Sequence, residues 1–348
     1  MLQGNKLMKN WPKISVVISN YNGLNLNILE ESIASILKNN YPNLEVLMVD
    51  NASTDRSVST IKKRFGQNPK LKILQNNVNM YSQGLNIGIN NSTGEFIAFF
   101  NNDVVVENGY FQEFVKFFNQ NPDVVLAQGK LLSYYDHHII DSAGEVIDSY
   151  GSPITLGART LASDGFKETT KVLSVSGSCS MIRKSTLDEV GLLDPDYGIG
   201  YEDLDLALRC WLKGYKVMYY PKVRAFHRRG VTDLSPELRV KVRWHFNKNR
   251  IATMIKNYPP GFILKNLPKT ILIYSVAGLW EIIVKRKVKL GLTRFSSILW
   301  NLIHLPQTLA KRGLIQSQAK KGGKKMIEQL LYKKSILKEG FLLFVHSK

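Results

Sequence analysis

Two clusters of acidic and amide side chains are the strongest candidates for chemistry in this sequence. The stretch EFIAFFNNDVVV has a polar interruption at residues 101–103 inside an apolar run. The stretch GIGYEDLD places Glu202, Asp203 and Asp205 behind a glycine-rich loop. Carboxylate and amide oxygens are suitable ligands for Mg²⁺ or Mn²⁺, and crowded carboxylates raise one another's pKa, which is how a general base is tuned. The simpler alternative for the second cluster is that its acids only complement a helix dipole.

A third candidate is the stretch AFHRRG, in which His227 adjoins Arg228 and Arg229. It follows the predicted strand KVMYYP, residues 216–221. An imidazole and two guanidinium groups can serve a metal-bound diphosphate, whereas a histidine on its own is more often structural.

The elements that must position these residues follow from hydrophobic periodicity. Apolar, β-branched runs recur about every thirty residues, as expected for parallel strands joined by crossover helices that cover both faces of a sheet. The sequence therefore predicts an α/β doubly wound fold. The predicted strands are residues 14–19, 44–49, 71–74 and 95–100, and the predicted helices are residues 24–39, 55–65, 81–92 and a helix that opens at residue 202.

Polar residues follow each of the four predicted strands. Asn and Asp are common in turns, so each loop alone is explained by turn chemistry. Because the carboxyl ends of parallel strands meet at one edge, four such loops predict a polar ligand site there. These residues are Asn20 to Asn22, Asp50 and Asn51, Asn76 to Asn79, and Asn101 to Asp103.

Several ligand classes are excluded because their motifs are absent. The sequence contains no G-x-G-x-x-G, no G-x-x-x-x-G-K-[ST], no G-x-S-x-G and no CxxC. With only Cys179 and Cys210, and no signal-peptide pattern at the N-terminus, we expect a cytoplasmic protein.

Five motifs in order resemble those of glycosyltransferase family 2, and most closely its rhamnosyltransferase-like members. They are VVISNYNG, VDNASTDRS, NNDV, the long block VSGSCSMIRKSTLDEVGLLDPDYGIGYEDLDLALRCWLKGYK, and AFHRRG. The resemblance spans residues 12–260 and implies an inverting, metal-dependent enzyme with a GT-A fold that uses a nucleotide-sugar donor of the UDP, dTDP or GDP type.

The resemblance also assigns roles to individual residues on the donor side. It implies that Asp103 and His227 bind Mn²⁺ or Mg²⁺. Asp50 would read the nucleotide base, in a pocket lined by Asn20 and Asn22. The remaining donor contacts would come from Asn79, Gly84, Asn86 and Asn102, although Met80 and Tyr81 stand where relatives usually have Gly and an aromatic residue.

On the acceptor side, the resemblance implies that Asp203 is the catalytic base, with Glu202 as the fallback. Gly177 and Ser178 would lie under the acceptor, and the alternative is that they form a tight turn between strands. Asp194 would help to shape the acceptor loop, and residues 130–170 would form a flap. Processive relatives carry a Q-x-x-R-W segment that is absent here, so we expect one sugar to be added per binding event.

The last third of the chain has a different composition. Residues 241–348 contain 22 Lys and Arg against three acids, a net charge of +19, whereas residues 1–240 are balanced. We expect a catalytic domain at residues 12–260 and a basic helical region at residues 261–348. The apolar run at residues 271–284 is too short to cross a bilayer and contains an acid.

Amphipathic segments in this basic region predict binding to an anionic membrane surface, on the inner face of the cell membrane, with a lipid-linked saccharide as acceptor. One alternative is a solvated helical bundle packed on the catalytic domain. Two further alternatives concern function: a nucleic-acid-binding protein, although no nucleic-acid motif is present, and a catalytically inactive sugar-nucleotide-binding relative.

Overall fold

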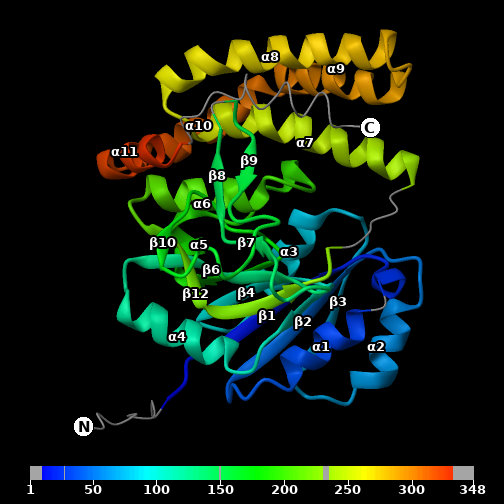
Figure 1. The fold of residues 1–348 in the computed structure, drawn as a ribbon, viewed down its shortest axis with the longest axis vertical. Helices are drawn as coiled ribbons and strands as arrows, with labels where there is room; N and C mark the ends of the chain where they lie inside the picture. Colours follow the sequence, from blue (N-terminus) through cyan, green and yellow to red (C-terminus); the bar gives the residue numbers. More distant parts are fainter. Residues whose placement is uncertain (1–9, 27, 149, 230–234, 332–348) are drawn as a thin grey trace.

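The computed structural model describes residues 10–26, 28–148, 150–229 and 235–331. Three parts of the chain discussed above lie outside the described residues: residues 1–9, Gly230 of the AFHRRG motif, and residues 332–348 at the end of the basic region. The described part contains a ten-stranded sheet with helices on both faces and a helical C-terminal region (Figure 1). The predicted α/β class, with a basic helical region after it, is confirmed.

The N-terminal half of the sheet matches the predicted strands and helices. The strands β1, β2, β3 and β4 are parallel, and each is joined to the next by a helix. Their bounds are β1 Ile14–Asn20, α1 Leu29–Leu37, β2 Leu44–Asn51, α2 Ser57–Phe65, β3 Leu71–Asn76, α3 Tyr81–Asn90 and β4 Phe96–Asn101. The 3-10 helix η1, Gly23–Leu26, precedes α1.

The strand register brings the predicted polar loops to one edge. Asn20 at the end of β1 is aligned with Asp50 of β2, and Ser19 is aligned with Asn101 of β4. Asn51 of β2 is aligned in turn with Asn76 of β3. The parallel alignment therefore places the carboxyl end of every strand in this half at the same edge of the sheet.

The second half of the sheet adds the two longest strands, β6 and β12, and several short strands, some of them antiparallel. Its elements are β5 Val104–Val106, α4 Tyr110–Gln120, β6 Val124–Ser133, β7 Ile140–Ser142, β8 Glu145–Ile147, β9 Pro153–Thr155, β10 Thr170–Lys171, β11 Cys179–Arg183, α5 Lys184–Val190, η2 Pro195–Tyr197, α6 Glu202–Leu212 and β12 Lys216–His227. β12 extends beyond the predicted strand because its last residues pair with β5, so His227 ends this strand opposite Val104. β8 and β9 form a separate hairpin within the predicted flap.

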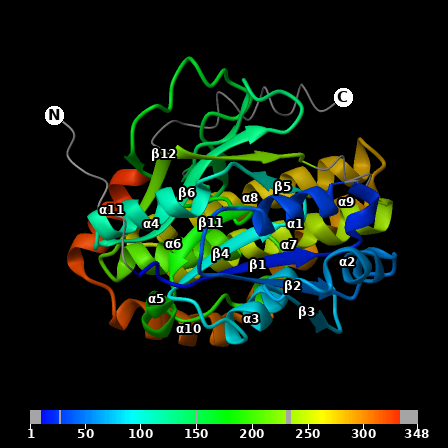
Figure 2. The same cartoon turned by 90° about the horizontal axis from the view of Figure 1, so that it is seen from below.

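Both faces of the sheet are covered, which explains the continuous apolar strands. Val16 and Ile18 of β1 face a core formed with α1, α2 and α4, whereas Val17 faces a core formed with α3, α5 and α6. Figure 2 shows α1 and α4 on one side of β1 and β4, with α3 and α5 on the other.

Within residues 235–331, five helices follow the sheet, with bounds α7 Pro236–Asn257, α8 Pro260–Ile283, α9 Val288–Ile303, α10 Leu305–Ser317 and α11 Lys321–Leu330. α8 packs on α9, α9 packs on α7, and α11 packs on α6. In Figure 1, α8 and α9 form the upper edge of the molecule, with α7 beneath them. Among the described residues, no helix has the length and apolar character needed to span a bilayer.

Candidate active site

One cavity of about 470 Å³ at the carboxyl edge of the sheet contains residues from all three candidate clusters. Its lining combines the end of β4, the end of β12, the turn before β11 and the start of α6. The predicted site residues in this lining are Asn102, Asp103, Gly177, Ser178, Glu202, Asp203 and His227.

Asp103 and His227 face each other in this cavity. The pairing of β12 with β5 places His227 beside the residue that follows Asp103, and Nε2 of His227 lies 3.3 Å from Oδ1 of Asp103. Nδ1 of His227 lies 2.8 Å from Oδ2 of Asp141 on β7. Because a carboxylate only accepts, Nδ1 carries the proton in this hydrogen bond and Nε2 is directed at Asp103.

The charges around His227 favour its imidazolium form. Burial lowers its pKa, but the hydrogen bonds and negative charges of Asp103 and Asp141 outweigh burial and raise the pKa to about 9. Arg229 in turn pairs with Asp141, with Nε 2.5 Å from Oδ1.

The residues at this position fit a divalent cation. A carboxylate oxygen is an ordinary ligand of Mn²⁺ and Mg²⁺, and the Nε2 atom of a neutral imidazole can bind Mn²⁺. The two atoms face one another here, so a cation bound between them would take the place of the Nε2 proton of the imidazolium. Within the described ranges, no group of three or more His, Cys, Asp and Glu side chains is arranged to hold a metal. A cation bound by Asp103 and His227 therefore needs further oxygen ligands from a substrate or water.

In the second candidate cluster, two backbone N–H groups hold the carboxylate of Asp203. Its Oδ2 accepts a hydrogen bond from the Gly177 N–H at 2.8 Å, and its Oδ1 accepts one from the Leu204 N–H at 2.7 Å. Glu202 is 5% exposed, and its Oε2 has no hydrogen-bond partner among the described residues. The two neighbouring carboxyl groups thus have different surroundings.

Burial raises the pKa of both carboxyl groups, but the remaining contributions to the two pKa values differ. Burial raises the pKa of Glu202 well above its ordinary value, and the negative charges of Asp203 and Glu145 add to the effect. Burial also raises the pKa of Asp203, but its backbone hydrogen bonds oppose that rise. Of the two groups, Asp203 is therefore the one that more readily carries the negative charge.

The prediction that Asp205 belongs to this crowd of carboxylates is wrong. Asp205 is fully buried on another side of α6, where Arg209 and Lys256 both lie 2.9 Å from its carboxylate oxygens. Although burial raises its pKa, Lys256 and Arg209 outweigh burial and lower it.

The loop in front of α6 depends on glycine and on α7. Gly198 and Gly200 have positive φ angles of 68° and 78°, a conformation that other residues adopt at a cost. Asn249 of α7 donates hydrogen bonds to the carbonyl oxygens of Tyr197, Ile199 and Gly200, at 2.9, 3.0 and 2.7 Å. A helix outside the sheet therefore holds the loop that presents Glu202 and Asp203.

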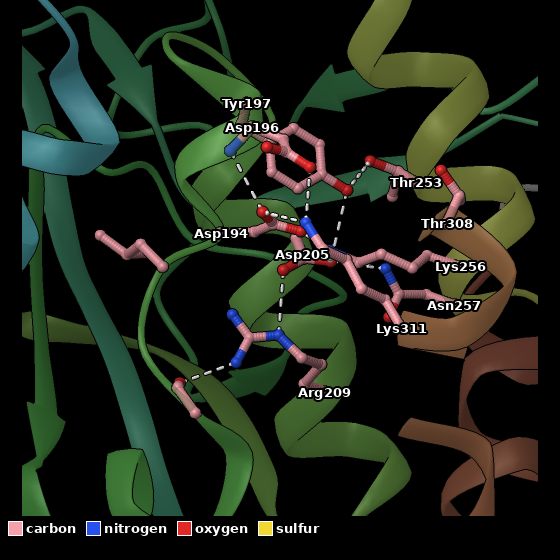
Figure 3. A network of polar contacts seen from close by, with 12 residues as sticks. Asp194, Asp196, Tyr197, Asp205, Arg209, Thr253, Lys256, Asn257, Thr308 and Lys311 are labelled. Carbon is pink, nitrogen blue, oxygen red and sulfur yellow. Dashed lines mark hydrogen bonds and ion pairs between the residues drawn. The ribbon is translucent and has the colours of Figure 1, made fainter. Parts of the chain in front are cut away.

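A buried polar network continues this support (Figure 3). Lys256 of α7 lies 2.6 Å from Oδ2 of Asp194 as well as 2.9 Å from Asp205. Lys311 of α10 pairs with the other oxygen of Asp194 at 2.7 Å and with Asp196 at 2.6 Å. Asp194, expected to shape the acceptor loop, is thus tied to two C-terminal helices.

The three residues expected to surround the nucleotide base, Asp50, Asn20 and Asn22, lie outside the cavity lining. Asp50 is buried and accepts hydrogen bonds from Asn20 at 2.8 Å and from the Ser53 hydroxyl at 2.5 Å. Asn22 accepts one from the Thr54 N–H at 2.8 Å. Asn102 donates to Oδ1 of Asn20 at 2.9 Å, so this cluster adjoins the cavity.

The remaining three donor-side residues have packing contacts. Asn79 is half-buried between β3 and α3. Gly84 packs on Asn51, whose Oδ1 would lie 2.1 Å from a Cβ atom at position 84. The Asn86 side chain is hydrogen-bonded to both backbone groups of Leu193, at 2.7 and 3.1 Å. The structure brings none of the three into the cavity lining, and their donor-binding roles stay predictions.

Several cavity residues were not predicted. Tyr81 was noted only as a departure from relatives, yet its hydroxyl donates to Oδ1 of Asn101 at 2.8 Å inside the cavity. Glu145 also lines it, and Asp141 stands behind His227, whereas Arg229, which lines it too, belongs to the AFHRRG candidate cluster. The only sequence signal was the pair of acids around a glycine in DSAGE, within the segment expected to be a flap.

A family profile described as Glycosyl transferase family 2 matches residues 15–191, about half of the chain. The chain belongs to glycosyl transferase family 2. One relative of this family 2 chain is an uncharacterized glycosyltransferase of Haemophilus influenzae, which is 29% identical over 36% of this chain and 38% of its own length. Another is the O-antigen biosynthesis protein RfbC of Myxococcus xanthus, which is 25% identical over 65% of this chain and 18% of its own length. The family 2 chain thus spans well under half the length of each.

A solved structure shares the fold of this family 2 protein. GalNAc-T7, crystallised with UDP, GalNAc and Mn²⁺, superimposes with a TM-score of 0.60 at 15% identity, over 85% of this chain and 58% of its own. The GT-A architecture expected from the sequence is confirmed.

Proposed function

We propose that this family 2 protein transfers one sugar, with inversion, from a nucleotide-sugar donor to a hydroxyl group of a saccharide acceptor in polysaccharide synthesis. The observation that carries the proposal is the presence of Asp103 with His227, and of Glu202 with Asp203, in one cavity. The name of the relative RfbC, an O-antigen biosynthesis protein, supports the acceptor class. The UDP and Mn²⁺ of the GalNAc-T7 structure support a nucleotide-sugar donor and a divalent cation.

In this proposal, Asp203 removes the proton from the acceptor hydroxyl group. The hydroxyl oxygen forms a bond to the anomeric carbon while the bond from that carbon to the diphosphate breaks on the opposite face. Asp203 suits this role because it carries the negative charge of the pair, whereas the buried Glu202 holds a proton. The Gly177 N–H fixes the direction of the Asp203 carboxylate, and the backbone of Gly177 and Ser178 supports the acceptor.

Asp103 and His227 would hold the divalent cation at the leaving group. When bound, the cation neutralises the charge that develops on the diphosphate. We assign Asn102 to the ribose or the sugar, Asp50 to the base with Asn20 and Asn22 beside it, and Asn79, Gly84 and Asn86 to the sugar and phosphates, for a UDP, dTDP or GDP donor.

The donor proposal is tested by thermal unfolding of the purified protein with UDP, GDP, dTDP or CDP, each with Mn²⁺, Mg²⁺ or EDTA. A ligand that binds only the native state raises the melting temperature, here by about 2 to 5 °C for one of the four nucleotides at saturation. The shift should disappear with EDTA. Equal shifts with and without metal would contradict the cation site.

We expect Asp141 to position His227 for the cation. Replacing Asp141 with alanine removes the acceptor that holds the Nδ1 proton and should weaken Mn²⁺ binding about 10- to 100-fold. Asp141→Asn keeps a carbonyl oxygen as acceptor, so its Mn²⁺ affinity should fall less than that of Asp141→Ala. The measurements are Mn²⁺ titration by electron paramagnetic resonance and the ¹⁵N shifts of the His227 ring, which report its tautomer. Asp136→Asn, an exposed acid of the same segment, is the control, and unchanged Mn²⁺ affinity in Asp141→Ala would refute the role.

We further propose that the protein works at the inner face of the cell membrane and uses a lipid-linked saccharide as acceptor. The net charge of +19 in residues 241–348 supports attraction to anionic lipids. The predicted division of labour, with catalysis at residues 12–260 and membrane contact at residues 261–348, is part of this proposal.

A further inference from the structure

The hairpin of α8 and α9 presents large aliphatic side chains to the outside. Leu272 and Leu302 are 64% and 61% exposed, which is unusual for leucine in helices of more than a dozen residues. We call this surface the hairpin face. It consists of Leu272, Ile273, Val276, Leu279, Trp280 and Ile283 on α8, Val284 just after α8, and Val288, Leu292, Leu299, Leu302 and Ile303 on α9.

The most buried positions of the same two helices are small or polar, while Leu267 and Ile298 are partly buried and pack inward. The buried residues of the two helices include no Leu, Ile, Val, Met or Phe within the part of the chain that the structure describes. They are Asn266, Thr270, Tyr274, Ala277 and Gly278 on α8, and Gly291, Thr293, Ser297 and Asn301 on α9. A helix pair in water buries its aliphatic residues and exposes its polar ones, whereas here the fully buried positions are small or polar and most of the large aliphatic side chains lie outside.

The contact between the two helices has the chemistry of helices packed in lipid. A Cβ atom on Gly291 would lie 2.7 Å from the carbonyl oxygen of Gly278, so glycine permits a close approach of the two backbones. Glu281 points inward, where Arg294 of α9 and Arg243 of α7 lie 3.0 and 3.1 Å from its oxygens. Small residues and internal polar pairs at helix contacts, with aliphatic residues outside, are typical of helices surrounded by acyl chains.

Cations stand at the ends of the hairpin face. Lys265 and Lys269 are exposed near the start of α8, and residues 285–289 add four Lys and Arg at the turn into α9. Glu281, which is paired internally, is the sole acid between residues 258 and 320. This arrangement is complementary to an anionic bilayer, because the cations reach headgroups while the aliphatic side chains reach the acyl region.

We propose that the hairpin face is immersed in the acyl layer of an anionic membrane, with α8 and α9 lying in the membrane plane. This inference rests on the membrane association proposed above and adds that the hairpin is inserted, beyond electrostatic adsorption to the surface. The in-plane orientation follows because the exposed aliphatic side chains run along the length of both helices, from Leu272 to Ile283 on α8 and from Val288 to Ile303 on α9.

Trp280 on the hairpin face provides the first test. The full chain is mixed with vesicles of phosphatidylcholine and phosphatidylglycerol whose acyl chains carry bromine, which quenches tryptophan on contact. We expect quenching that persists at about 0.5 M salt, where the screening length is roughly 4 Å. The chain has five tryptophans, so Trp280→Phe serves as the reference and should lose the quenched component while still binding vesicles.

The second test changes the hairpin face itself. The double variant Leu272→Lys with Leu279→Lys should lower the partition coefficient for vesicles about a hundredfold. Each substitution removes one leucine side chain from the acyl layer, which lowers the partition coefficient about tenfold. Leu161→Lys, at a leucine 46% exposed outside the hairpin, should leave partitioning unchanged. Melting temperatures equal to that of the parent would show that the variants fold.

Three outcomes would overturn the inference. Vesicle binding that is lost at high salt without bromine quenching would leave the association in place but exclude insertion. A dimer in solution that Leu272→Lys dissociates, without vesicle binding, would show that a second copy covers the face. A monomer that binds no vesicles would contradict both membrane proposals. None of these results bears on sugar transfer, which nucleotide binding and turnover test separately.

Discussion

Replacing Asp203 with asparagine is expected to reduce sugar transfer about a thousandfold, the range contributed by a general base. Asparagine keeps the shape of the side chain and can accept the Gly177 N–H hydrogen bond, but it cannot take a proton. Donor binding should persist, because Asp103 and His227 are unchanged. Transfer is measured as release of the nucleoside diphosphate in the presence of acceptor, and donor binding by the nucleotide-dependent melting shift.

The neighbouring carboxyl group provides the sharpest control. Because burial and the Asp203 charge keep Glu202 protonated, Glu202→Gln replaces a neutral acid with a neutral amide of similar shape. We expect a loss of less than about tenfold, far below that of Asp203→Asn. Asp188→Asn, an exposed acid on α5, should have no effect. If Glu202→Gln is inactive and Asp203→Asn is active, the base is Glu202.

Replacing Lys256 with methionine is expected to lower the free energy of unfolding by about 3 to 5 kcal/mol. Lys256 is 4% exposed and bridges Asp194 and Asp205, so its loss leaves buried carboxylate charge without one of its cations. Asp205 retains Arg209 and Asn257. Urea denaturation followed by circular dichroism measures the change, with Lys222→Met, an exposed lysine on β12, as the control.

A double variant separates charge loss from lost packing. If the cost of Lys256→Met comes from uncompensated negative charge at Asp205, then adding Asp205→Asn should destabilise the protein by less than the sum of the two single changes. Additive costs would show that the lysine acts through packing instead. A cost below about 1 kcal/mol for Lys256→Met alone would place this bridge among the weak ion pairs.

The strands and the placement of Glu202 and Asp203 at the start of a helix could be predicted because they depend on local sequence. The run of Val and Ile at residues 14–19 determines β1 through burial on both faces, and a glycine loop before Glu202 marks the start of α6. The wrong expectation for Asp205 was avoidable. Two residues along a helix are about 200° apart around its axis, so Asp203 and Asp205 lie on different faces.

Other parts of the site depend on contacts between distant residues. The hydrogen bond from His227 to Asp141 joins positions 86 residues apart through a three-residue strand that periodicity does not reveal. Glu281 interrupted an apolar segment in the sequence, and only its partners Arg243 and Arg294 explain why the charge lies inside the helix bundle. In both cases the partner is fixed by tertiary packing.

The contacts of Asn249 and Lys311 with the loop before α6 limit which C-terminal helices can be combined with this loop. The C-terminal helices carry the residues that support the loop, while the loop carries the glycines and Asp194 that fit them. A tail exchanged with that of a relative would meet a loop shaped for other partners. We therefore expect hybrids to function only when the loop before α6 and the C-terminal helices come from the same parent.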